Sequence, residues 1–143
     1  MNSLHTNHLQ SFQLPSFADH RGTLTVADLA DLKATLGFET QRVFWITQVN
    51  SGETRGTHAH KSCWEALLAV SGGFKLKISN GHESWVEMVK ADGRGVVIPP
   101  MFWCELYEFA PGTVCLCLAS EPYDEAGYLK DYDDFIHYVR RKA

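Results

Sequence analysis

The stretch that decides the fold is GETRGTHAHKSCWEALLAVSGG, residues 52–73. Two histidines, His58 and His60, stand one residue apart, and Glu65 follows them. Residues i and i+2 of a β-strand project to the same face, so both imidazoles are expected to point the same way. Glu65 can join them from the strand after the turn. The pattern therefore predicts a cluster of three polar side chains between two strands.

The glycines around this cluster extend the pattern. The spacing from Gly52 through the histidine pair to Gly72 resembles the first sequence motif of the cupins, which are small jelly-roll barrels. A second cupin motif supplies a glycine, a proline and a histidine. Gly93 and Pro99 stand at the matching spacing, but Cys104 takes the place of the histidine. The resemblance implies a barrel with the histidine pair inside, and it leaves the chemistry open because this fold supports many activities.

Short apolar runs separated by turn signals make up most of the chain. Asn80-Gly81 is the strongest hairpin signal, and the residues before it alternate between apolar and polar, as in a half-buried strand. Runs of this kind lie at 22–29, 42–49, 101–109 and 113–120, with several more within 65–100. We therefore predict an all-β fold, a cupin-type jelly-roll (double-stranded β-helix) barrel.

Only two segments are typical of helices. Residues 27–38 can form a short helix or turn, and a C-terminal α-helix is expected at 129–141 because acids stand early, bases late, and apolar residues form one stripe. With no linker or repeat, residues 1–143 are expected to form a single cupin domain, in which 1–27 is an N-terminal strand region.

Composition narrows the class of protein. A net charge of -4 and a pI near 5.9 argue against a general nucleic-acid binder, which needs a basic face. No window is apolar for long enough to span a bilayer, and the first residues carry no export signal, so we expect a cytoplasmic protein with no membrane or nucleic-acid partner. The four cysteines are Cys63, Cys104, Cys115 and Cys117. They form no CxxC pair, and three of them are expected to be free, buried thiols. Cys115 and Cys117 alternate within an apolar run, so both are expected to face one side of a strand.

A narrower resemblance covers nearly the whole chain. The stretches RVFWI, GETRGTHAHKSCWEALL, IPPMFWCELYEF and CLASEPYDEAGYLKDYDDFIHYV, together with DHRGTL at 19–24, are similar to the WxcM-like sugar 3,4-ketoisomerases. These small cupins convert dTDP-4-keto-6-deoxyglucose to a 3-keto isomer for deoxyamino sugars. The resemblance implies that His58 and His60 are the catalytic acid/base groups, that no metal or cofactor is needed, and that a homodimer exchanges its N-terminal strands. It also implies a role in cell-wall or O-antigen (lipopolysaccharide) assembly.

The residue types agree with this chemistry. A ketone moves from C4 to C3 through an enediol, which requires a group that both takes and gives a proton near pH 7, and histidine, with a pKa of about 6.5, is suited to that. A nucleotide diphosphate also needs fixed cations. The candidate cations are Arg21, Arg42, Arg55 and Lys61. Trp103 and Tyr107 can stack on thymine or sugar, or can equally be plain barrel core.

The chain departs from the family pattern at three places. Phe44 and Trp45 replace two tyrosines, Glu65 replaces a glutamine, and Cys104 replaces a histidine. Glu65 and Cys104 are expected to line the substrate pocket, yet both are also competent ligands for zinc or iron. Two alternatives therefore stay open beside the ketoisomerase. One is a metal-dependent cupin enzyme using both histidines with Glu65 and Cys104, and the other is a non-catalytic nucleotide-sugar binding module.

Overall fold

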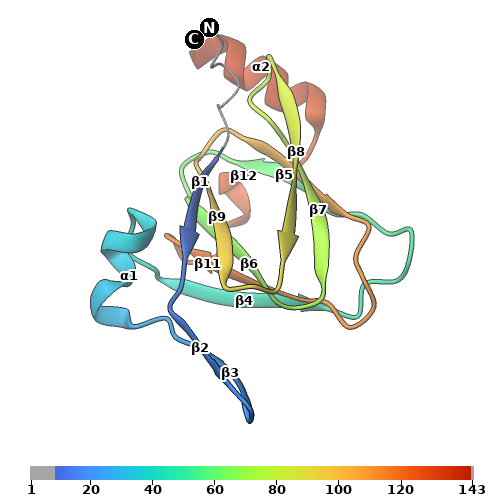
Figure 1. Cartoon of the computed structure of the whole chain (residues 1–143). Helices are drawn as coiled ribbons and strands as arrows, with labels where there is room; N and C mark the ends of the chain where they lie inside the picture. Colours follow the sequence, from blue (N-terminus) through green and yellow to red (C-terminus); the bar gives the residue numbers. More distant parts are fainter. Residues whose placement is uncertain (1–8, 143) are drawn as a thin grey trace, which may run out of the picture.

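Two five-stranded antiparallel sheets form a barrel in the computed structural model, which describes residues 9–142 (Figure 1). The first sheet has the spatial order β1 (Gln10–Gln13), β9 (Arg94–Ile98), β6 (Glu65–Ser71), β11 (Val114–Ala119) and β4 (Arg42–Thr47). The second has the order β12 (Tyr128–Leu129), β5 (Arg55–His60), β10 (Trp103–Tyr107), β7 (Gly73–Ser79) and β8 (Ser84–Lys90). The predicted all-β, cupin-type fold is confirmed.

Alternating side chains fill the space between the sheets. On β7, Phe74, Leu76 and Ile78 are almost fully buried, and the residues between them face outward, as the sequence predicts. Asn80 forms the turn to β8. Its Oδ1 accepts hydrogen bonds from the backbone N–H groups of His82 and Glu83. This apolar packing leaves one end of the barrel interior for polar groups.

Two helices cover the outer faces of the sheets. Helix α1 (Leu29–Leu36) begins after Asp28, whose side chain caps it, and buries Leu32 and Leu36 against the first sheet. Helix α2 (Tyr132–Lys142) buries Phe135 completely against the second sheet. No helix within residues 9–142 is long and apolar enough to cross a membrane.

The C-terminal helix begins later than the predicted 129–141, because the residues before it extend the second sheet. Tyr128 pairs with His60, and Leu129 with Ala59, in the short strand β12. Asp131 then accepts hydrogen bonds from the first backbone N–H groups of α2. A 3₁₀ turn, η2 (Glu125–Gly127), leads into β12. This arrangement anchors Tyr128 beside the histidine pair.

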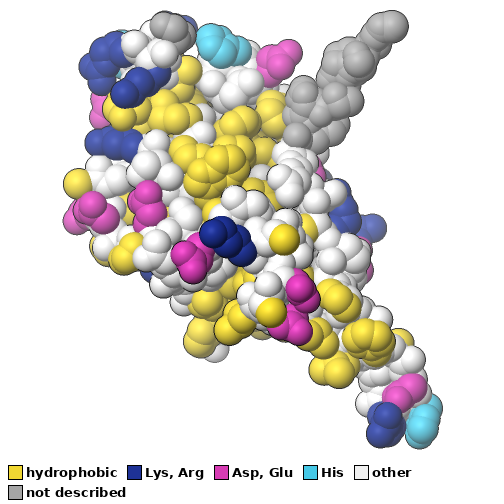
Figure 2. Space-filling model, turned by 90° about the vertical axis from the view of Figure 1, so that its left-hand side faces the viewer, with side chains coloured by type: hydrophobic (Ala, Val, Ile, Leu, Met, Phe, Trp, Pro, Cys, Tyr) yellow, Lys and Arg dark blue, Asp and Glu magenta, His cyan; other side chains and the backbone are white. Residues whose placement is uncertain are grey.

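The N-terminal region forms an arm rather than the single strand predicted at 22–29. Strands β2 (Ser16–Asp19) and β3 (Gly22–Thr25) pair as a hairpin that extends away from the barrel (Figure 1). Apolar side chains lie along the arm, and charged ones gather at its tip (Figure 2). The strand ends at Thr25, and Asp28 caps helix α1 three residues later.

Candidate active site

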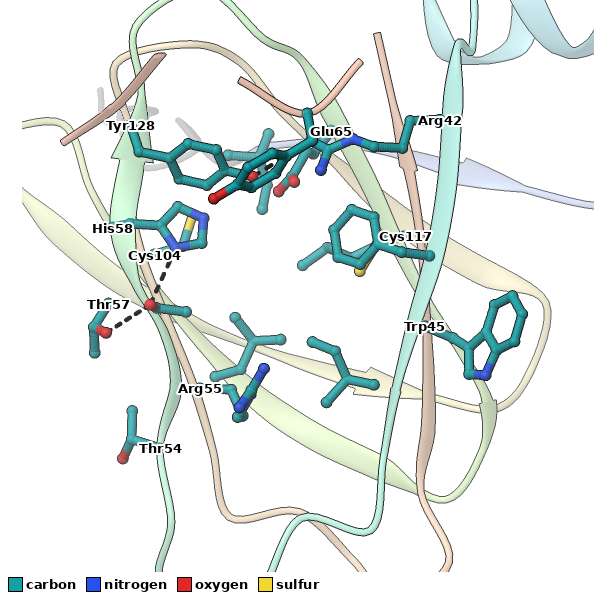
Figure 3. A pocket seen from close by; sticks show the side chains of 17 residues that line it. Arg42, Trp45, Thr54, Arg55, Thr57, His58, Glu65, Cys104, Cys117 and Tyr128 are labelled. Carbon is teal, nitrogen blue, oxygen red and sulfur yellow. Dashed lines mark hydrogen bonds between the residues drawn. The ribbon is translucent and has the colours of Figure 1, made fainter. Parts of the chain in front are cut away.

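A cavity of about 500 Å³ lies between the two sheets at the end of the barrel where β5 and β4 carry their polar residues (Figure 3). Apolar side chains such as Leu67, Ile98 and Leu106 form much of its wall. Polar and aromatic groups from both sheets and from the segment around β12 also line it, among them Arg42, Arg55, His58, Glu65, Cys104, Tyr123 and Tyr128. An apolar cavity with a few convergent polar groups is the usual form of a small-molecule site.

His58 is held in one tautomer by the backbone. Its Nδ1 lies 3.0 Å from the carbonyl oxygen of Gly56, and a carbonyl can only accept, so Nδ1 donates and Nε2 keeps its lone pair. Burial of the ring, together with the neighbouring His60, lowers the pKa of His58 below its ordinary value of 6.5. His58 is therefore a neutral base at pH 7, at the wall of the cavity.

A β-bulge creates the carbonyl position that His58 uses. His58 pairs with Cys104 and Gly56 pairs with Glu105, so Thr57 is an extra residue on β5. Gly56 has a φ of 83° and Thr57 a φ of 54°, both in the left-handed region that costs an ordinary residue energy. This backbone conformation turns the Gly56 carbonyl toward the imidazole, and a dashed line marks the resulting hydrogen bond of His58 (Figure 3).

His60 lies behind His58 and does not line the cavity. Its Nε2 is 3.1 Å from Oε2 of Glu65, and both side chains are more than nine-tenths buried. The approach is off the direction that a hydrogen bond needs, so Nε2 has no well-directed partner within the described chain. The rings of His58 and His60 lie edge to face at 4.9 Å. The histidine pair thus divides into one residue at the cavity and one buried beside a carboxylate.

Three of these side chains are also placed as metal ligands would be. His58, His60 and Glu65 each bring one suitable atom within 4.8 Å of the others. Among residues 9–142, Cys104 is not part of this group. Burial raises the pKa of the Cys104 thiol well above its usual range, and its Sγ approaches the carbonyl of Phe102 at 3.7 Å. Cys104 lines the cavity as a neutral thiol.

Arg42 and two tyrosines close one side of the cavity. Arg42 donates from Nη2 to the hydroxyl oxygen of Tyr128 at 3.4 Å and from Nε to the carbonyl of Glu121 at 3.2 Å. Its guanidinium lies over the rings of Phe44 and Tyr123, at 5.0 and 5.6 Å. The Tyr128 ring is 5.0 Å from His58 and 4.5 Å from His60.

Sequence reasoning missed both tyrosines. They stand in EPYDEAGYLKDY, a stretch whose resemblance to the family pattern assigns neither tyrosine a role. Nothing in their spacing shows that Tyr128 pairs with His60 of strand β5, about 70 residues earlier in the chain. The one available signal in the sequence was a pair of tyrosines in a polar stretch just after an apolar strand.

Other candidate residues lie outside the cavity. Trp103 packs under α2, where its Nε1 donates to Glu105 at 3.0 Å, so it is barrel core, the alternative that the sequence left open. Tyr107 does not line the cavity either, and Lys61 lies over the ring of Tyr138 on α2. Arg21 stands at the tip of the arm, 78% exposed and paired with Asp19 at 2.6 Å. Of the four cations, Arg42 and Arg55 are at the site within one chain.

Comparisons with known proteins point to one group of enzymes. A family model described as FdtA, WxcM-like, C-terminal, matches residues 7–140. The chain is 28% identical over 123 residues to TDP-4-oxo-6-deoxy-α-D-glucose-3,4-oxoisomerase from Aneurinibacillus thermoaerophilus, with 86% of each sequence covered.

Solved structures of ketoisomerases share the fold. A mutant of the 3,4-ketoisomerase QdtA from Thermoanaerobacterium thermosaccharolyticum, in complex with TDP-4-keto-6-deoxyglucose, has a TM-score of 0.87 and 30% identity, with 95% of this chain and 96% of that one covered. The TDP-quinovose 3,4-ketoisomerase WlaRB from Campylobacter jejuni has a TM-score of 0.81 and 28% identity, with 92% and 98% covered.

Proposed function

The chain belongs to the FdtA, WxcM-like, C-terminal family, and on that premise we propose that it is a TDP-sugar 3,4-ketoisomerase. Its substrate is TDP-4-keto-6-deoxyglucose, as in the relatives of that name and title, and its product is the 3-keto isomer, made for deoxyamino sugars of surface glycans. The four cysteines are all free and buried, which favours a reducing cytoplasm.

One observation carries the mechanism: the lone pair of His58 Nε2 belongs to a neutral ring at the cavity wall. His58 removes the proton from C3, the C3–H electrons form a C3=C4 double bond, and the C4 carbonyl electrons move to its oxygen, which takes up a proton. The enediol then gives up the proton on the C3 oxygen, which balances the proton taken up at the C4 oxygen; the C3 carbonyl forms, and C4 takes a proton from the imidazolium of His58. The net change is a ketone moved by one carbon.

His60 supports this cycle without touching the substrate. It is 5% exposed and lies between His58 and the buried carboxylate of Glu65. Because β5 and β6 belong to different sheets, the contact between His60 and Glu65 also ties the two sheets together at the site. We assign His60 and Glu65 to positioning His58 and to stabilising its charged form during turnover.

The proposed enzyme is a homodimer that exchanges its arms. Phe17 and Leu24 pair across the arm and are 62% and 63% exposed, more than an isolated hairpin of this kind is expected to leave in water. Docking of the arm on a second copy covers them. It also allows Arg21 at the tip to reach the partner's cavity and to join Arg55 in binding the diphosphate.

The direct test is an NMR assay with TDP-4-keto-6-deoxyglucose. We expect new sugar resonances from a 3-keto product, and His58→Asn to lower kcat by about a hundred- to ten-thousand-fold. His137→Asn is the matched control, because His137 is exposed on α2 away from the cavity. Binding of TDP without any turnover by the wild type would instead support a non-catalytic binding module.

A metal-dependent enzyme is the second candidate function, favoured by the three ligand atoms within 4.8 Å of one another. A divalent ion there would polarise the substrate carbonyl. Elemental analysis of protein purified without chelator decides between the two. About one ion per chain, with activity that falls on chelation and returns with the same metal, would support this candidate and contradict the metal-free mechanism.

A further inference from the structure

We propose that Tyr128 is the acid that protonates the ketone oxygen as the enediol forms, and that Arg42 is the residue that positions it. This inference rests on the proposed ketoisomerase function and adds a second proton-transfer group to it. It follows from the placement of Tyr128 beside His58 and from the direction of its hydrogen bond with Arg42.

The backbone fixes Tyr128 next to the histidine pair. Strand β12 pairs with β5 so that Tyr128 stands opposite His60, and the backbone N–H of Lys61 donates to the carbonyl of Gly127 at 2.8 Å. The ring therefore packs against both imidazoles, at 5.0 Å from His58 and 4.5 Å from His60. Figure 3 shows Tyr128 and His58 on the same side of the cavity. A substrate that places C3 at His58 brings C4 and its oxygen close to the phenol.

The contact with Arg42 determines what the phenol can do. Arg42 has no acceptor atom, so its Nη2 donates and the oxygen of Tyr128 accepts. The hydroxyl proton must then point elsewhere, and it is available to an oxygen in the cavity. Arg42 is itself fixed by the carbonyl of Glu121 and by the rings of Phe44 and Tyr123. A positive group beside the phenol also stabilises the anion that remains once the proton has left.

Several of the other cavity-lining groups are poorer acids for this step. From β4, Phe44 and Ile46 present no exchangeable proton. Thr57 donates its hydroxyl proton to Gly56 and points away from the cavity (Figure 3). The pKa of the Cys104 thiol is raised well above its usual range by burial, so that group gives up its proton reluctantly. Tyr123 is 61% exposed. Tyr128 is the partly buried hydroxyl that lies against His58.

The proton balance closes with two groups. In the first half, His58 Nε2 takes the C3 proton, and Tyr128 gives its hydroxyl proton to the C4 oxygen, leaving a neutral enediol, an imidazolium and a phenolate. In the second half, the phenolate takes the proton from the C3 oxygen, the C3 carbonyl forms, and C4 takes the proton from the imidazolium. Both groups return to their starting states, and no cofactor or outside redox partner is required.

The experiment compares Tyr128→Phe with wild type in the NMR assay. Phenylalanine keeps the ring packing on both histidines and removes only the hydroxyl. We expect kcat to fall about a hundred-fold or more, since general acid catalysis contributes that much, while KM and the affinity for TDP change less than about threefold. Tyr138→Phe, on α2 and outside the cavity, is the matched control and should retain wild-type kcat. Near-ultraviolet circular dichroism and denaturant unfolding check that both variants fold alike.

Arg42→Lys separates positioning from diphosphate binding. If Arg42 acts through Tyr128, the substitution lowers kcat in the wild type and has little further effect on kcat when Tyr128 is already phenylalanine. If Arg42 binds the diphosphate instead, KM rises equally in both backgrounds, which would overturn its positioning role. A Tyr128→Phe protein with wild-type kcat would overturn the assignment of Tyr128 and leave the ketoisomerase proposal intact. A wild-type protein without any turnover would overturn both.

Discussion

Gly56→Ala tests how the backbone prepares His58. Gly56 has a φ of 83°, where an alanine costs about 1–2 kcal/mol. A Cβ at this position would also lie 3.1 Å from the carbonyl oxygen of Cys104 and 3.1 Å from a methyl group of Leu106, closer than normal packing allows. Such overpacking forces neighbouring atoms to shift, which costs about 1–3 kcal/mol more. The expected loss in the free energy of unfolding is therefore about 2–5 kcal/mol.

A second glycine separates the two costs. Gly112 has a φ of 75°, and a Cβ there would meet nothing within 4 Å, so Gly112→Ala carries the backbone cost alone. We expect it to lose about 1–2 kcal/mol and to keep wild-type kcat. Gly56→Ala should lose more and should also lower kcat, because a shifted Gly56 carbonyl releases the Nδ1 hydrogen bond of His58.

The assay is urea unfolding of both variants and wild type at one protomer concentration, since a dimer makes apparent stability depend on concentration. Turnover is measured on the same samples by NMR. Equal destabilisation by the two substitutions, together with wild-type kcat for Gly56→Ala, would refute the reasoning that the bulge positions His58.

Three further predictions concern pH, the arm and Cys104. The pKa of His58 is below 6.5 in the folded protein, so between the folded and unfolded pKa values the unfolded chain binds more protons, and stability should fall as the pH drops below 6.5. The loss of kcat/KM on the acidic side of its pH profile should likewise occur below pH 6.5, and a loss above pH 6.5 would contradict the assignment of His58 as the base. His58→Asn should lose this part of the pH dependence of stability. Replacing Phe17 and Leu24 on the arm with serine should weaken self-association, measured by sedimentation equilibrium, together with TDP binding, measured by titration calorimetry. A wild-type protein that is monomeric and fully active would disprove arm exchange. Cys104→His should fold and change the rate or the product ratio by NMR, whereas a variant with unchanged rate and product would show that this cavity position does not act on the sugar.

Local sequence patterns were enough to predict most of the barrel. The alternation in β7, the turn at Asn80 and the apolar stripe of α2 each depend on residues close in the chain, and each is confirmed. The same holds for the pair Cys115 and Cys117, which share one face of β11 with their sulfurs 3.9 Å apart. Periodicity captures such features because neighbouring residues decide them.

The rest depends on contacts between distant segments. The arm forms as a hairpin because β2 and β3 pair across a turn in which Asp19 accepts the backbone N–H of Arg21, a contact that alternation alone does not show. Tyr128 joins the site only because β12 pairs with β5, and His60 differs from His58 because Glu65 meets it from the other sheet. Spacing showed that the two histidines share a face, but it could not show that one is exposed to the cavity and the other is buried.

The central claim is that His58, and not His60, exchanges the proton at C3. The most direct measurement is the rate at which substrate and product gain deuterium at C3 and C4 when TDP-4-keto-6-deoxyglucose is incubated in D₂O with wild type, His58→Asn or His60→Asn. We expect exchange with wild type, slower exchange with His60→Asn, and none above background with His58→Asn. Exchange that survives in His58→Asn and disappears in His60→Asn would contradict this claim.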